Sequence, residues 1–231
     1  MLAVLCLLVV IFITPILFII MNSFKGKLYI SDNPFNWPSG DMFAGLENYT
    51  EGIRKTGFFA AFGWSAFITV GSVLVIVLFT SMTAWYITRV KTRLSNTLYY
   101  LFVFSMVVPF QMVMFTMSKL ADMLKLNNPV GMIFLYLGFG AGLSVFMFCG
   151  FVKSIPLEIE EAAMIDGCTP IQTFFQIVMP ILKPTAITVA ILNAMWVWND
   201  YLLPYLVIGV STPYKTIPVA VQYLMGSYGA K

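Results

Sequence analysis

The chain has 231 residues, of which 60% are hydrophobic and only 10% are charged, and its formal net charge is +3. A soluble domain carries about 25% charged residues, so this sequence has too little polar surface to cover a water-soluble globule. The mean hydropathy of +0.89 excludes a disordered chain and an ordinary soluble enzyme, and with uncharged stretches longer than a bilayer is thick it predicts an all-α integral membrane protein.

Five windows are long and apolar enough to cross a bilayer, because a helix rises about 1.5 Å per residue and the hydrocarbon core is about 30 Å thick. The first lacks the basic n-region of a signal peptide, so we interpret it as a retained helix. Pro15 and Pro109 lie inside two windows, where a membrane bundle tolerates proline, and we expect a kink at each. The predicted spans are residues 2–22, 64–88, 97–118, 130–152 and 184–207.

The segment 23–57 follows the first span and contains the turn signals Asn33-Pro34, Trp37-Pro38 and Ser39-Gly40. It is too short for a core of its own, so we interpret it as an ordered external loop. The sequence shows no internal repeat, and residues 1–231 are predicted to form one transmembrane domain.

The short turn after the second span sets the predicted orientation. It carries Arg89, Lys91 and Arg93 and no acid, which places it in the cytoplasm by the positive-inside rule. Alternation then puts residues 153–183 in the cytoplasm and residues 119–129 outside. The total of Lys and Arg over all loops opposes this orientation, but we give precedence to the short turn because long loops follow the rule less closely.

The 153–183 loop is predicted to contain two short helices. Pro156 suits the first turn of a helix, and the three acids that follow it, Glu158, Glu160 and Glu161, complement the positive end of the helix dipole. Gly167 suits the left-handed residue that closes this helix.

A second helix is predicted to start immediately afterwards. Thr169 and Gln172 have the spacing of a capping box, with Pro170 at the first helical position. Pro180 and Pro184 are expected to limit this helix. The two helices would form a helix-turn-helix that projects from the membrane. Capping patterns alone do not exclude the alternative that this segment is only a solvated connector.

Within the same loop, Glu161-Ala162-Ala163 is followed after three residues by Gly167, after nine more by Ile177, and after one more by Met179-Pro180. This spacing resembles the EAA signature of membrane subunits of binding-protein-dependent ABC importers, which usually have leucine at the position of Met179. By this resemblance the residues that couple the loop to an ATPase are Glu161, Ala162, Ala163, Asp166, Gly167, Ile177 and Pro180.

Shorter motifs elsewhere resemble the MalG-like carbohydrate permease branch of this family. They occur in the expected order as Asn22-Ser23-Phe24-Lys25, Asn48-Tyr49, Ala84-Trp85-Tyr86 with Arg89, Pro109-Phe110-Gln111 and Trp198-Asn199-Asp200. The implied fold is the type I importer permease bundle, also called MetI-like. Family members continue beyond the equivalent of residues 226–229 into a sixth helix, so we expect that this chain shows five spans and lacks the sixth at its C-terminus.

The resemblance implies a permease subunit, not an enzyme, that forms half of the pathway for a sugar or oligosaccharide in the cell membrane of a prokaryote. The implied partners are a second related permease, two ATPase subunits that hold ATP and magnesium, and an external solute-binding protein. A permease for another small solute stays open as an alternative. An ATP-independent channel or secondary transporter is disfavoured, because a coupling ion usually needs several buried acids.

The resemblance also gives Glu161 a role. We expect its carboxylate to contact a basic group of the ATPase, while Ala162 and Ala163 allow close approach and Gly167 supplies the turn. Closure of the ATPase dimer would then move the loop as a lever.

Asp200 is the one acid inside an apolar stretch, and a charge at mid-bilayer costs on the order of 3 kcal/mol. With Gln111, Asn193 and Asn199 it is a candidate for the sugar pathway, because hydroxyl-rich substrates need hydrogen-bond partners. The alternative is that the helix ends near Asp200 and the carboxylate lies at the interface. In the fourth predicted span, Gly138, Gly140 and Gly142 include a GxxxG step, which predicts close helix packing.

The sequence shows no catalytic or metal-binding pattern. It contains no histidine, and its three cysteines, Cys6, Cys149 and Cys168, are scattered and are interpreted as small hydrophobic residues. No P-loop is present, so no cofactor is expected in this chain. The charge is too diffuse to predict a nucleic-acid partner.

Overall fold

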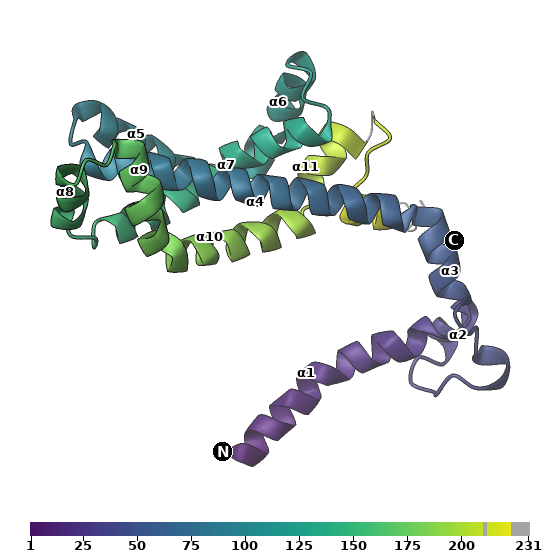
Figure 1. Cartoon of the computed structure of the whole chain (residues 1–231). Coiled ribbons are helices and arrows are strands. Elements are labelled where there is room, and N and C mark those ends of the chain that lie inside the picture. The colour runs from purple at the N-terminus through teal and green to yellow at the C-terminus, as the bar shows by residue number, and fades with distance from the viewer. Residues whose placement is uncertain (210–211, 223–231) are drawn as a thin grey trace. The chain divides into compact units, whose positions relative to one another are not determined.

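The computed structural model describes residues 1–209 and 212–222 of the chain. Contacts divide the chain into two compact units, Met1–Phe59 together with the chain from Val221, and Ala60–Ala220. Over the described ranges the secondary structure is helical, apart from one isolated antiparallel bridge between Lys25 and Phe43. The predicted all-α fold class is therefore confirmed, and Figure 1 shows its helices.

The first unit contains one long apolar helix and a folded segment that follows it. α1 (Leu2–Ser23) runs through Pro15 without a break. The segment after it forms α2 (Lys27–Asp32), a 3-10 turn (Gly40–Met42) and α3 (Glu47–Thr56).

Lys25 organises that segment, because its side chain is fully buried. Its Nζ donates to the carbonyl oxygens of Asn33 and Pro34 at 2.8 and 3.2 Å. The side-chain amide of Asn48 donates to the carbonyl oxygens of Ser23 and Lys25, both at 2.8 Å. Residues 23–57 therefore have a fixed fold that depends on polar residues from both ends of the segment.

The second unit contains the remaining long helices and several short ones. In chain order they are α4 (Phe58–Arg89), α5 (Arg93–Ser105), α6 (Phe110–Met123), α7 (Pro129–Val152), α8 (Leu157–Ile165), α9 (Pro170–Thr173), a π-helical turn (Phe174–Val178), α10 (Met179–Asn199), α11 (Leu202–Pro204), a second π-helical turn (Tyr205–Gly209) and α12 (Ile217–Gln222). α4 begins at its boundary with the first unit and α12 ends at it.

Four helical stretches in the described residues are long and apolar enough to cross a membrane: Val4–Ser23, Phe58–Arg89, Pro129–Val152 and Pro170–Asn199. A fifth span results if α5 and α6 are counted as one broken span, since they meet at an angle of 106°. The sequence predicts one kinked span over residues 97–118, whereas the chain breaks between Ser105 and Phe110. Pro109 precedes α6 with an extended backbone and restricts the residue before it, which explains a break in place of a kink.

Two further helix boundaries differ from the predicted spans. α4 begins at Phe58, not at residue 64, so the apolar residues before the predicted span belong to the same helix. α10 ends at Asn199, short of residue 207, because the Asp200 backbone is extended and its Oδ1 accepts a hydrogen bond from the Leu202 amide at 3.0 Å. A carboxylate that caps the next helical turn favours a helix end at this position.

α7 lies at the centre of the second unit, where it packs against α5 and α10. A Cβ on Gly140 would lie 2.7 Å from Asn193 Oδ1 on α10, and one on Gly142 would lie 2.9 Å from the Phe102 carbonyl oxygen on α5. A Cβ on Gly138 would meet open space. The predicted close packing therefore holds at Gly140 and Gly142 and is wrong at Gly138.

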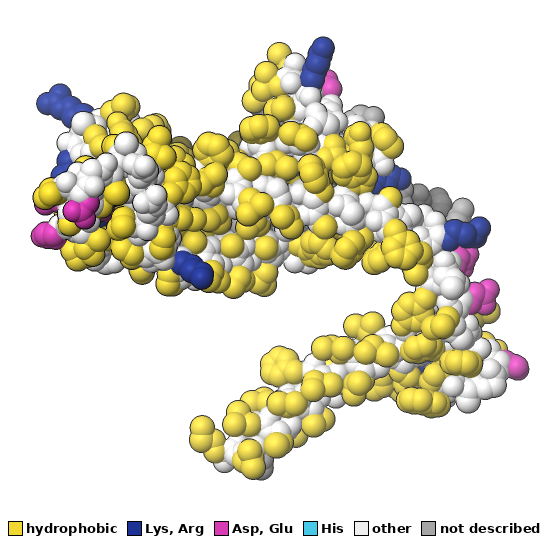
Figure 2. Space-filling view, viewed as in Figure 1, with side chains coloured by type: hydrophobic (Ala, Val, Ile, Leu, Met, Phe, Trp, Pro, Cys, Tyr) yellow, Lys and Arg dark blue, Asp and Glu magenta, His cyan; other side chains and the backbone are white. Residues whose placement is uncertain are grey.

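The surface has the pattern of a protein that lies in lipid. Figure 2 shows hydrophobic side chains along the helices of the second unit, while charged side chains gather around α8 and α9 and at the tip of α6. Leu74 on α4 and Met195 on α10 are 65% and 62% exposed. Large apolar side chains with this exposure favour a hydrocarbon environment.

Candidate functional site

The 153–183 loop forms one end of the second unit (Figure 1). α8 ends at Ile165 with Asp166 as its C-cap, and beyond it the Cys168 amide donates to the Ala163 carbonyl and the Gly167 amide donates to the Met164 carbonyl. This pair of bonds is a Schellman motif, and it requires the positive φ of +88° that Gly167 adopts. The predicted left-handed residue at Gly167 is thus confirmed.

The predicted capping box is also present. The Thr169 amide donates to Gln172 Oε1 at 2.8 Å, and the Gln172 amide donates to Thr169 Oγ1 at 3.4 Å. The box starts α9 directly after the turn at Gly167.

The predicted limit on the second helix is wrong. α9, the π-helical turn and α10 form a single helical stretch from Pro170 to Asn199. Pro180 comes directly after the π-helical turn, whose i→i−5 bonding interrupts the regular i→i−4 pattern, and Pro184 is accommodated inside the helix. The loop therefore continues without a break into a long apolar helix.

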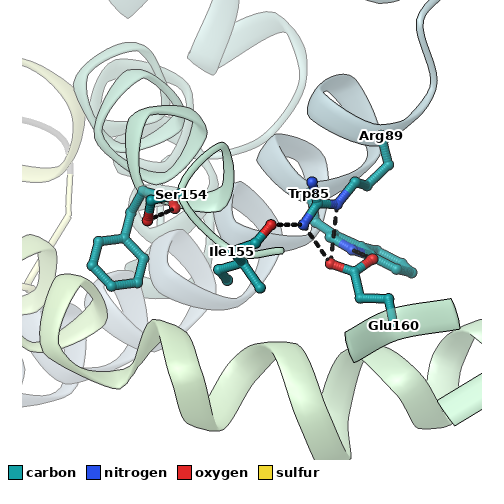
Figure 3. Close-up of polar contacts among 6 residues, drawn as sticks. Trp85, Arg89, Ser154, Ile155 and Glu160 are labelled. Atoms are coloured by element: carbon teal, nitrogen blue, oxygen red, sulfur yellow. Dashed lines mark hydrogen bonds and ion pairs between the residues drawn. The ribbon is translucent and has the colours of Figure 1, made fainter. Parts of the chain in front are cut away.

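Glu160 attaches α8 to α4 (Figure 3). Its side chain is almost fully buried, at 2% exposure for the residue. Arg89, the last residue of α4, donates to Glu160 Oε1 from Nη2 at 2.7 Å and from Nε at 3.0 Å. Trp85 Nε1 donates to the other carboxylate oxygen, Oε2, at 2.9 Å. Trp85 and Arg89 are four residues apart, so they lie on one face of α4.

Two further contacts extend this attachment. Arg89 Nη2 also donates to the carbonyl oxygen of Ile155, in the turn before α8, at 2.9 Å. The Trp85 ring lies 5.5 Å from the ring of Phe174, the buried first residue of the π-helical turn. We call the set Trp85, Arg89, Ile155 and Glu160 the α4–α8 clamp. It joins the end of α4 to α8, and through Trp85 it also contacts the π-helical turn that follows α9.

The energetics of the clamp follow from its burial. Desolvation offsets much of the attraction in a buried ion pair, but loss of one partner leaves an uncompensated charge and costs about 3 to 5 kcal/mol. The Arg89 and Glu160 side chains are 18% and 3% exposed. The pair is therefore a strong constraint on where α8 can lie.

The EAA residues predicted from the sequence lie mostly on the outer side of the loop. Ala163 is buried at 7% exposure, on the same helix face as Glu160 three residues earlier, and Ile177 is half-buried. Glu161 forms no ion pair within residues 1–209 and 212–222. The exposed members of the set are Glu161, Ala162, Asp166, Gly167 and Pro180.

Sequence reasoning missed the role of Glu160. It grouped Glu158, Glu160 and Glu161 as partners of the helix dipole, whereas only the middle residue is buried. The one sequence feature that points to this contact is the pair Trp85 and Arg89, which is part of a motif shared with the carbohydrate permease branch. Nothing in the sequence links that pair to a residue 71 positions from Arg89.

The four candidate pathway residues are not brought together by any direct contact among the described side chains. Asp200 Oδ2 accepts a hydrogen bond from the buried Tyr136 hydroxyl at 3.0 Å. Asn199 donates to the Met195 carbonyl at 2.7 Å, and Gln111 is exposed on the first turn of α6.

Asn193 lies between α7 and α10. Its amide nitrogen donates to Ser144 Oγ at 3.2 Å and to the Val189 carbonyl at 2.9 Å. Asn193 and Trp196 line a cavity of about 170 Å³ beside Gly140. An amide and an indole ring at one cavity offer both a hydrogen bond and a stacking surface.

In the described part of the chain, no three His, Cys, Asp or Glu side chains are close enough to hold a metal ion.

Comparison with known proteins connects these features to a transport family. Residues 76–229 match the family described as binding-protein-dependent transport system inner membrane component. The chain is 40% identical over 216 residues to a probable starch degradation products transport system permease protein, AmyC, of Thermoanaerobacterium thermosulfurigenes, covering 94% of this chain and 77% of that protein.

A second relative is the multiple sugar-binding transport system permease protein MsmG of Streptococcus mutans, 33% identical over 222 residues, with 95% of this chain and 79% of that protein covered. Among solved structures, the chain resembles one from a bacterial ABC transporter that imports the acidic polysaccharide alginate. The TM-score is 0.80 at 18% identity, covering 99% of this chain and 80% of that chain. That likeness shows the fold.

Proposed function

Because the chain belongs to the family of binding-protein-dependent transport system inner membrane components, we propose that it forms half of the translocation pathway of an ATP-driven importer for a sugar or oligosaccharide. It is a multi-pass membrane permease and not an enzyme. The names of two relatives support the substrate class, since AmyC is described as a permease for starch degradation products and MsmG as one for multiple sugars. Its location is the cell membrane of a prokaryote.

The partners are a second related permease, two ATPase subunits and an external solute-binding protein. ATP and magnesium belong to the ATPase subunits. The end of the bundle that holds the 153–183 loop and the basic turn Arg89–Arg93 faces the cytoplasm, in agreement with the positive-inside rule.

The outer side of the 153–183 loop docks on an ATPase subunit. Glu161 contacts a basic group there, and Ala162 allows close approach because it has almost no side chain. Its exposure together with that of Glu161 supports this role. Gly167 and Asp166 hold the turn, Ala163 packs beneath it, and Ile177 and Pro180 lie where the loop joins α10.

The α4–α8 clamp is the observation that carries the coupling mechanism. A force on α8 reaches the end of α4 through Glu160 and Arg89, because a buried ion pair resists separation. It reaches α10 through the helical stretch that starts at Pro170. Closure of the ATPase dimer therefore moves two membrane helices together.

The cavity lined by Asn193 and Trp196 belongs to the sugar pathway. Its residues come from α7 and α10, and α10 is one of the two helices that the loop moves. Gln111, Asn199 and Asp200 supply further polar groups to the pathway, with Asp200 held by Tyr136.

The test is uptake by the complete transporter in proteoliposomes, with the solute-binding protein on the outside and ATP inside. A panel of labelled maltotriose, raffinose, spermidine and glutamate separates the substrate classes. We expect ATP-dependent uptake of an oligosaccharide that requires the binding protein. Uptake without ATP, or uptake of only spermidine or glutamate, would contradict the proposal.

A further inference from the structure

A second feature lies at the same end of the bundle as the α4–α8 clamp. The end of α4, the start of α5 and the end of α7 enclose a cavity of about 290 Å³. The polar residues that line it are Thr88, Lys91, Asn96, Tyr99 and Lys153. A volume of this size holds a phosphate group with room for a glycerol.

The charge of the cavity is positive and uncompensated. Its lining includes Lys91 and Lys153 and no acid. Both lysines are exposed, and neither forms an ion pair with another described residue. Arg89, close by in the sequence, differs because Glu160 neutralises it. Two unpaired ammonium groups at one cavity attract an anion.

The lining also includes Asn96, whose amide can donate a hydrogen bond. Asn96 lies in the first turn of α5, whose positive end is capped by Thr92 through a bond from the Ser95 amide at 3.2 Å. Thr88 Oγ1 is buried and faces the Cys149 thiol, which also lines the cavity, so we do not count it among the donors available to a ligand. Lys153 Nζ lies 5.4 Å from the centre of the Tyr99 ring, which holds the ammonium group at the cavity.

An apolar surface continues from the cavity along α5. Tyr100, Leu101 and Phe104 are 68%, 57% and 65% exposed. On a membrane helix such side chains face lipid, so the charged cavity lies beside the path of acyl chains. Basic pockets between membrane helices on the cytoplasmic side suit anionic lipid headgroups.

We propose that this cavity binds a phosphate group, supplied by the headgroup of an anionic phospholipid in the cytoplasmic leaflet. Lys91 and Lys153 neutralise the phosphate, Asn96 donates a hydrogen bond to it, and the exposed face of α5 contacts the acyl chains. The assignment to the cytoplasmic leaflet rests on the orientation given under the proposed function. The phosphate site itself rests on the cavity and its two lysines.

The test is lysine acetylation of the assembled transporter in nanodiscs, read by mass spectrometry. One sample contains phosphatidylcholine alone, a second contains phosphatidylcholine with phosphatidylglycerol, and a third contains phosphatidylcholine with millimolar inorganic phosphate. Lys119 and Lys125 are matched internal controls, because both are exposed and belong to the opposite predicted membrane face. A general effect of a negative membrane surface would protect both pairs of lysines equally.

We expect phosphatidylglycerol to slow acetylation of Lys91 and Lys153 at least about fivefold more than that of Lys119 and Lys125, as one lysine–lipid contact is worth roughly that factor. In Lys153→Gln, protection of Lys91 should fall by about the same factor. Protection by inorganic phosphate alone would support the phosphate site and assign its source to the solution.

Equal protection of the two pairs, or no protection in either sample, would overturn the proposal. The experiment needs no sugar. Its failure is therefore distinguishable from failure of ATP-dependent sugar uptake, which is measured separately.

Discussion

Glu160 on α8 and Arg89 at the end of α4 form a buried ion pair with an Nη2–Oε1 distance of 2.7 Å, across 71 positions of sequence. Trp85 completes the carboxylate's hydrogen bonds at 2.9 Å. The pair makes the 153–183 loop mechanically continuous with a membrane helix. A loop held only by its two chain ends could shift without moving α4.

Replacement of Glu160 by glutamine should loosen α8. The variant keeps the size of the side chain but removes the charge that Arg89 pairs with, at a cost of about 3 kcal/mol, or roughly a hundredfold in the docked population of α8. Limited proteolysis of the purified transporter should cut the loop faster. Glu158→Gln is the matched control, because Glu158 is exposed on the same helix. Equal proteolysis of the two variants would show that the ion pair does not hold α8.

A charge exchange, Glu160→Arg combined with Arg89→Glu, tests whether the two side chains interact directly. Each single variant places two like charges together and should prevent stable assembly. The double variant restores the attraction and should recover part of the assembled complex, measured by size-exclusion chromatography. Additive losses would argue against a direct pair.

Glu161→Lys should detach the ATPase subunits. Loss of one partner of a charge-assisted contact costs about 2 to 5 kcal/mol, so the affinity of the ATPase subunit should fall more than tenfold. Co-purification of the ATPase with the tagged permease measures this. Glu158→Lys makes the same charge change three residues earlier and should retain the ATPase; loss of the ATPase in both variants would remove the special role of Glu161.

Gly167→Ala should destabilise the turn between α8 and α9. A side chain at φ +88° costs about 1 to 2 kcal/mol, and no atom lies within 4 Å of the added Cβ, so the cost is confined to the backbone. Gly150→Ala is the control, because the added Cβ there also meets open space but the backbone is ordinary α-helix. Thermal unfolding of the purified complex should give a lower Tm for Gly167→Ala alone.

Gly140→Ala should disturb the packing of α7 on α10. The added Cβ would lie 2.7 Å from both Asn193 Oδ1 and Ile76 Cδ1, and such overpacking costs about 1 to 3 kcal/mol. Gly138→Ala, two residues earlier on the same helix, meets no atom within 4 Å and should unfold at the wild-type temperature or above. An equal Tm for the two variants would contradict the close contact at Gly140.

Structural features that depend on residues close together in the chain could be predicted from the sequence. The apolar windows gave the long helices, and the turn at Gly167 and the capping box at Thr169 follow from local hydrogen bonds. Pro109 predicts only a kink, because one proline does not reveal that α5 and α6 diverge by 106°. The continuity through Pro180 was missed because a π-helical turn, which has no sequence signature, precedes it.

Features set by contacts between distant helices could not be predicted. The burial of Glu160 depends on where α4 ends relative to α8. Nothing in the local sequence distinguishes Glu160 from the exposed residues Glu158 and Glu161. The same holds for the cavity at Lys91 and Lys153, which needs three helix ends at one place.

The most direct measurement of the coupling mechanism is the number of ATP molecules hydrolysed per sugar imported, in proteoliposomes with the binding protein. For Glu160→Gln we predict that ATP hydrolysis continues while sugar uptake falls, so that this ratio rises at least about tenfold above that of Glu158→Gln. An unchanged ratio, with both activities intact, would contradict transmission through the ion pair between Glu160 and Arg89.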